Sequence, residues 1–168
     1  MKYNWREFLA QVSDDLLNRA TKDDLEFLSY SKSYEKTTSA RWFGGNPVSP
    51  AEIESLETRL GLGLPKSYRE FLLTTNGWEA FLEFPYGIVS LLSVSVVDWF
   101  HKFDECVGRL DSYIDDSQQD GLVWGQAKIS HLEASLIVGE SDGNKCVLLN
   151  PTEKDSSGEW QVVCMNPD

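Results

Sequence analysis

The 168-residue chain is predicted to fold as a single α+β domain, residues 1–168, with helices flanking a mostly antiparallel or mixed, twisted sheet. Apolar residues follow helical spacing in the first half of the chain, whereas short apolar runs separated by turn sequences dominate the second half. The chain contains neither an internal repeat nor a regular alternation of strand and helix. Its length favours one domain, because a chain of this size buries roughly 70% of its unfolded surface without disulfides or metals.

An amphipathic helix is expected over residues 3–20, because apolar side chains recur there at intervals of three and four. These side chains are Trp5, Phe8, Leu9, Val12, Leu16 and Leu17. A short helix is expected from about Lys22, since Thr21 and Asp24 have the spacing of a capping box. The polar stretch 29–41 is then predicted to be a loop within the domain.

Two helices are predicted in the segment 42–78. Ser49 is a suitable N-cap for the first helix, with Pro50 in the first turn, Glu52 completing a capping box and Gly61 ending the helix. The second helix is expected to start at Leu64-Pro65 and to end at Asn76-Gly77, which would form its left-handed C-cap.

Residues 79–168 are predicted to contain most of the sheet together with further helix. Two apolar runs separated by Pro85-Tyr86-Gly87 predict a hairpin over 80–84 and 88–92. Helical spacing predicts a longer helix over 96–114. Three further strands are expected over 135–139, 146–149 and 160–165, with turns at 141–144 and 155–158.

The charge excludes several classes of partner. Twenty-seven acidic residues against fifteen basic ones give a net charge of −12, so nucleic acid and anionic lipid repel the chain unless bases cluster, and they do not. The longest uncharged stretch, 84–97, is shorter than a membrane span and contains Pro85 and Gly87. Charges near the N-terminus interrupt any signal-peptide core. We therefore expect an acidic cytoplasmic protein whose natural partners are basic.

No metal or cofactor is predicted. Cys106, Cys146 and Cys164 are odd in number, form no CxxC pair and have apolar neighbours, which is typical of reduced thiols inside a core. His101 and His131 have no spacing that would complete a zinc site or a Cys/His nucleophile pair.

Taken in order, several segments between Trp42 and Trp78 resemble the SUKH superfamily. They are the Trp42-Phe43-Gly44-Gly45 approach, a helix with the pattern Ile…Glu…Gly, the sequence LPKSYREFL and Asn76-Gly77. A weaker similarity continues through Ile137, Gly139, 142–144 and 148–149. The signature residues are Trp42, Gly44, Ile53, Glu57, Leu64, Pro65, Tyr68, Phe71, Asn76 and Gly77. The resemblance implies mainly structural roles for them, with Trp42 favoured as a core residue over an interface anchor.

The resemblance also implies a function. The superfamily includes bacterial toxin-immunity proteins and yeast regulators of cell-wall synthesis. By analogy the chain is a non-catalytic protein, a monomer or a weak homo-oligomer, that binds and blocks a cognate toxin, often a nuclease. Its acidity suits such a basic partner. The alternative is a regulatory scaffold domain that binds cellular proteins. The yeast members carry long flanking extensions that are almost absent here, which favours the immunity protein.

Candidate partner-binding residues are acidic or aromatic. The richest acidic region, 98–120, holds seven acidic residues against two basic ones. The candidates are Asp111, Asp115, Asp116, Asp120, Glu140, Asp142, Trp42 and Trp78. The competing interpretation for the acidic residues of 98–120 is an ordinary solvated surface. For the turn that contains Glu140 and Asp142 it is ordinary hairpin chemistry. No catalytic residue is predicted, because the neighbours Asp115 and Asp116 are not placed to act across a cleft as a glycosidase pair does.

Overall fold

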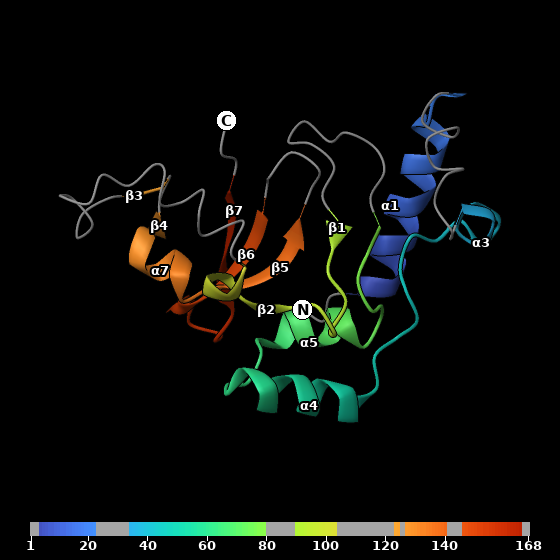
Figure 1. The fold of residues 1–168 in the computed structure, drawn as a ribbon. Helices are drawn as coiled ribbons and strands as arrows, with labels where there is room; N and C mark the ends of the chain where they lie inside the picture. Colours follow the sequence, from blue (N-terminus) through green and yellow to red (C-terminus); the bar gives the residue numbers. More distant parts are fainter. Residues whose placement is uncertain are drawn as a thin grey trace.

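The computed structural model describes residues 4–22, 34–79, 90–103, 123–124, 127–140 and 146–165. Its centre is an open antiparallel sheet in the order β1–β5–β6–β7, with β2 also paired to β5. The strands are β1 (Ser90–Leu91), β2 (Asp98–Trp99), β5 (Leu136–Glu140), β6 (Cys146–Lys154) and β7 (Trp160–Met165), and β3 (Val123–Trp124) pairs separately with β4 (Ala127–Lys128). Figure 1 shows α4 and α5 below the sheet, α1 beyond β1 and α7 on the opposite side. The α+β class is confirmed.

The helices are α1 (Trp5–Arg19), α3 (Tyr34–Ala40), α4 (Pro50–Leu60), α5 (Lys66–Leu72) and α7 (Ile129–Glu133), with a 3₁₀ turn at Phe100–Lys102. The helix predicted over 3–20 is α1, whose N-cap Asn4 accepts a hydrogen bond from the backbone N–H of Glu7. The capping box of α4 forms as predicted. The Ser49 N–H donates to Glu52 over 2.8 Å, and Gly61 ends the helix with a left-handed φ of 76°.

The prediction of a loop over 29–41 is wrong for its second part, where α3 forms. The helix ends without glycine, because Arg41 itself adopts a left-handed φ of 49° and the Trp42 N–H bonds to the Thr37 carbonyl. Left-handed backbone is costly for a residue with a Cβ. Arginine is therefore not a residue from which the sequence would predict the end of a helix. Three salt-bridge and hydrogen-bond contacts to Asp14 and Asn18 of α1 hold Arg41 in place.

The predicted helix over 96–114 does not start where the spacing places it. Val96 and Val97 lie in and after a turn, and the next residues form β2, which pairs Asp98 with Ile137 and Trp99 with Leu136. Val97 and Phe100 are fully buried, as a helix would also have required. Pairing with β5 therefore buries the same apolar residues whose spacing predicted a helix. Residues 104–114 lie outside the described residues, as do residues 23–33 of the predicted short helix and loop, residues 80–89 of the predicted hairpin, and the turn predicted over 141–144.

The distal part of the sheet agrees with the sequence. Strands β6 and β7 cover their predicted runs, and β5 is shifted by one residue from the run predicted over 135–139. Strand β6 continues through Pro151 to Lys154 with a register shift after Asn150. The buried Asn150 amide donates to Gln161 and its oxygen accepts from the Thr152 N–H, so the irregularity leaves this polar side chain bonded. In the turn that follows, Asp155 accepts three hydrogen bonds from Ser157 and Glu159, and those from Ser157, the largest cause, lower the pKa of its carboxyl.

Glu57 fastens α4 to α5. Its Oε1 accepts the Leu64 N–H over 2.7 Å, and both of its oxygens bind Arg69 Nη1 at 2.6 Å. Leu64 is thereby held at the start of α5, where it joins Tyr68 and Phe71 in the core. A carboxylate with a charged partner and a backbone partner restrains this connection more firmly than an exposed ion pair alone.

Tyr68 contributes its ring to the core but not its hydroxyl. The ring stacks on Phe71 with centroids 5.9 Å apart, and burial raises the pKa of the phenol. The hydroxyl oxygen has no hydrogen-bond partner. Tyr68→Phe is therefore expected to leave the free energy of unfolding unchanged or to raise it by about 1 kcal/mol. Phe71→Ala, the control, is expected to lose about 3–5 kcal/mol. Urea unfolding measures both, and a loss above about 1 kcal/mol for Tyr68→Phe would show that the hydroxyl is bonded.

Candidate functional site

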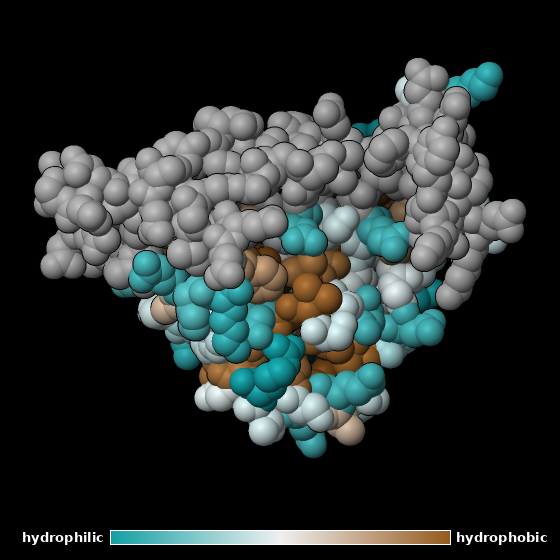
Figure 2. Space-filling model, in the orientation of Figure 1, coloured by the Kyte–Doolittle hydropathy of each residue, from teal (hydrophilic) through white to brown (hydrophobic). Residues whose placement is uncertain are grey.

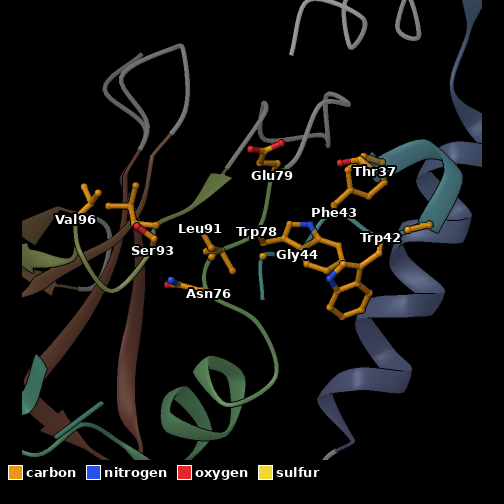
Figure 3. A pocket seen from close by; sticks show the side chains of 14 residues that line it. Thr37, Trp42, Phe43, Gly44, Asn76, Trp78, Glu79, Leu91, Ser93 and Val96 are labelled. Carbon is orange, nitrogen blue, oxygen red and sulfur yellow. The ribbon is translucent and has the colours of Figure 1, made fainter. Parts of the chain in front are cut away.

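A cleft of about 390 Å³ lies between α3, the loop after α5 and the segment around β1. Figure 3 shows Trp42, Phe43 and Trp78 at one side of this cleft, Ser93 and Val96 at the other, and Glu79 and Thr37 toward its upper rim. The cleft therefore combines aromatic walls with a polar and acidic rim. It is built by the segment 42–78 together with residues from β1 and the loop after it.

The aromatic wall consists of two tryptophans in edge-to-face contact. The ring centroids of Trp42 and Trp78 are 5.3 Å apart at 81°, and Phe43 packs against Trp78 at 6.1 Å. Trp78 is only 6% exposed, whereas Trp42 is half-buried. The guanidinium of Arg6 from α1 lies 3.8 Å from the centroid of the Trp42 ring, a cation–π contact that fixes this ring against the helix.

Backbone pairing positions the aromatic residues. The N–H of Trp78 bonds to the Leu91 carbonyl and the N–H of Leu91 to the Trp78 carbonyl, both at 2.9 Å. Gly44 bridges to the other side of Trp78, and the Glu79 N–H bonds to the Phe43 carbonyl. Two short segments thus extend the sheet beyond β1. Because they carry Trp42 and Trp78, the cleft forms at the edge of the sheet that faces α1.

The turn before Trp78 requires glycine. Gly77 has a left-handed φ of 82°, and a Cβ there would lie 2.8 Å from the Leu91 carbonyl oxygen. Asn76 Oδ1 accepts the Val94 N–H over 2.8 Å, so both residues dock the turn on the segment after β1. The prediction that Asn76-Gly77 forms a C-cap is wrong. Helix α5 ends at Leu72, and the pair instead turns the chain into the sheet.

Arg59 of α4 anchors the loop that carries Ser93 and Val96. Its Nη2 donates to the carbonyls of Val94 and Val97, each at 2.8 Å, and its Nη1 lies 3.1 Å from Asp98. Burial of the Asp98 carboxyl acts to raise its pKa. The Lys102 and Trp99 hydrogen bonds and the charges of Lys102 and Arg59 outweigh that effect, so the pKa is lowered and the group stays ionised. Arg59 and Asp98 therefore hold the loop between β1 and β2 against α4.

The charge around the cleft is acidic. Glu79 is exposed, and it is the charged residue among those described as lining the cleft. Glu140, also exposed, pairs with Ser90, while Leu91 next to it pairs with Trp78. Glu79 and Glu140 therefore stand on either side of β1 at the same end of the sheet. The spacing between neighbouring strands places the two residues about 10 Å apart.

The predicted partner-binding residues are brought together only in part. Trp42 and Trp78 meet in the cleft and Glu140 pairs with Ser90 of β1, while Asp111, Asp115, Asp116, Asp120 and Asp142 lie outside the described residues. Sequence reasoning missed Glu79, Val96 and Arg6. Glu79 directly follows the Asn76-Gly77-Trp78 run, which offered a signal. Val96 and Arg6 reach the site only through long-range packing.

Three further features of the described part of the chain concern metal ions, membranes and cysteines. No group of three His, Cys, Asp or Glu side chains there is arranged to hold a metal ion. No helix there is long and apolar enough to cross a membrane. Cys146 is buried, but the expectation that all three cysteines are core residues is wrong for Cys164, which is exposed on β7. Cys106 lies outside the described residues.

Two comparisons with known proteins match this chain. The model of the SMI1/KNR4 family (SUKH-1) matches residues 47–168, which include α4, α5, the turn at Gly77 and all the sheet strands. The uncharacterised protein YnaB of Bacillus subtilis (strain 168) is 50% identical over 36 residues. That match covers 21% of this chain and 25% of YnaB, so the chain spans about a quarter of the length of that relative.

A matched pair of variants can separate two effects on stability at Gly77, the close approach of Leu91 and the left-handed backbone. Gly61 has a similar φ of 76°, but a Cβ there would meet nothing within 4 Å. Gly61→Ala is expected to lose about 1–2 kcal/mol from backbone strain alone. Gly77→Ala is expected to lose about 1–3 kcal/mol more, because its Cβ pushes on the backbone of Leu91. Equal losses in thermal or urea unfolding would contradict this account of the turn.

Proposed function

This chain belongs to the SMI1/KNR4 family (SUKH-1), and on that premise we propose that it is a non-catalytic immunity protein that binds and neutralises a basic bacterial toxin in the cytoplasm of the producing cell. The observation that carries the proposal is the acid-rimmed aromatic cleft at Trp42 and Trp78. It supports binding of a protein side chain, because it is concave, largely apolar and bordered by a carboxylate.

The walls of the cleft suit a partner's lysine or arginine side chain. The aliphatic stem of such a side chain can pack against the aromatic rings and Val96, while its charged end reaches Glu79. Arg6 covers the Trp42 ring at 3.8 Å but is not among the described residues that line the cleft, and the charged residue among those is Glu79. Anchors of this kind, seated in an apolar pocket and surrounded by weaker contacts, supply most of the binding energy of tight protein complexes.

The overall charge supports the same partner. At −12, the protein attracts a basic toxin over distances longer than any single contact, which raises the association rate and favours the correct orientation. A nuclease is one such partner, since enzymes that act on a polyanion are themselves basic around the active site. An immunity protein that blocks it needs no catalytic group of its own.

The function is tested with any toxin domain that sequencing finds encoded beside the gene for this chain. Co-expression is expected to restore growth to cells that produce the toxin domain, and the two purified proteins are expected to form a one-to-one complex. Because charge drives encounter, the association rate should fall steeply as salt rises. A regulatory scaffold would give neither protection nor the complex, and that result with every toxin domain encoded nearby would overturn the proposal.

The role of the cleft is tested by placing the same charge at two exposed valines. Val96 lines the cleft and is 45% exposed, whereas Val162 lies on β7 away from it and is 59% exposed. Val96→Lys is expected to weaken the toxin complex about tenfold or more, because a fixed cation meets the partner's cation. Val162→Lys changes the net charge equally and should leave the affinity nearly unaltered. Equal affinities of the two variants would place the toxin elsewhere while leaving the immunity function intact.

A further inference from the structure

The two edges of the sheet differ in how they are covered. At one edge, the segment around Phe43 lies against α1, where the Phe43 N–H is buried and bonds to the Ser13 hydroxyl and Arg6 covers Trp42. At the other edge, β7 pairs with β6 on one side, and no described strand pairs with its outer side. A strand in this position presents a row of backbone donors and acceptors to any matching strand.

The residues of β7 favour pairing. Strand Trp160–Met165 reads WQVVCM and has no charged residue or proline, two kinds of residue by which proteins protect an open edge. Val162 is 59% exposed and is the most exposed large apolar side chain in the described part of the chain. Cys164, two residues on and therefore on the same face of the strand, is also exposed. The strand carries no charge on a molecule whose net charge is −12.

We propose that β7 pairs antiparallel with β7 of a second copy of this chain, joining the two sheets across a two-fold axis. A strand that meets itself about such an axis is antiparallel by symmetry, and each copy offers the same donors and acceptors. When the axis passes beside Val162, the Val162 side chains of the two copies lie directly opposite each other and bury part of the exposed apolar face.

Charge selects the second copy over a basic partner. A basic toxin gains nothing from an uncharged strand, whereas two acidic copies can approach each other closely only through a strip that bears no charge. The dimer must still overcome the mutual repulsion of two chains at −12 each. Its affinity should therefore increase with salt, opposite in sign to the salt dependence of a complex with a basic toxin, as repulsion is screened.

Sedimentation equilibrium of the full chain tests the proposal, with a reductant present so that Cys164 forms no covalent dimer. We expect a reversible dimer whose Kd falls as sodium chloride rises from about 50 mM to about 500 mM. Val162→Lys should raise the Kd about tenfold or more, because two lysines meet across the axis. Val96→Lys, with the same change in charge at a distant valine, should dimerise like the wild type. Thermal melts establish that both variants fold.

Hydrogen exchange locates the contact independently. Backbone amides within 161–165 are expected to gain protection with rising protein concentration in the wild type and not in Val162→Lys. A monomer at every concentration up to about 1 mM at both salt levels would overturn the proposal. Dimerisation of Val162→Lys equal to that of the wild type would overturn it as well. Loss of the toxin complex in Val162→Lys, with no dimer in the wild type, would assign the strand to the toxin instead.

Discussion

The pairing of Trp78 with Leu91 joins the helical half of the chain to the sheet, and the cleft depends on it. Two reciprocal backbone hydrogen bonds form there, and they bring the two segments so close that Gly77 has no room for a Cβ. The Asn76 amide then fixes Val94 beside this pair. Because Gly44 bridges to Trp78, the Trp42 ring is placed by the same contact. Gly44, Asn76 and Gly77 therefore contribute backbone contacts and close packing at this junction.

The elements that sequence predicted correctly are those whose signals are local. The capping box at Ser49, the left-handed Gly61 and the alternating run of β7 all depend on residues within a few positions of each other. The errors arose where a distant partner decides. Asn76-Gly77 has the chemistry of both a helix cap and a tight turn, and the strand containing Leu91 selects the turn. In the same way β5 draws Asp98 and Trp99 into the sheet from a segment with helical spacing.

The sequence offered Trp42 and Trp78 as separate candidates, with Trp42 favoured as a core residue, and gave no sign that the two rings are in contact. Glu79 and Glu140 lie on neighbouring segments only because β1 stands between them, and no spacing in the sequence reveals that. The proposed role of Asp111, Asp115, Asp116, Asp120 and Asp142 stays a prediction, since these residues lie outside the described part of the chain.

The cleft separates the residues that build it from those that a partner would touch. Gly77, Asn76 and Arg59 hold its walls through backbone contacts and hydrogen bonds, whereas Val96 and Glu79 expose their side chains at its rim. A change of an exposed side chain costs little stability, while a change at a junction such as Gly77 disturbs the pairing itself. The same frame can therefore present different charge and shape to different partners. Under the function proposed above, the exposed rim would change with the partner while the hydrogen bonds that hold the backbone stay the same.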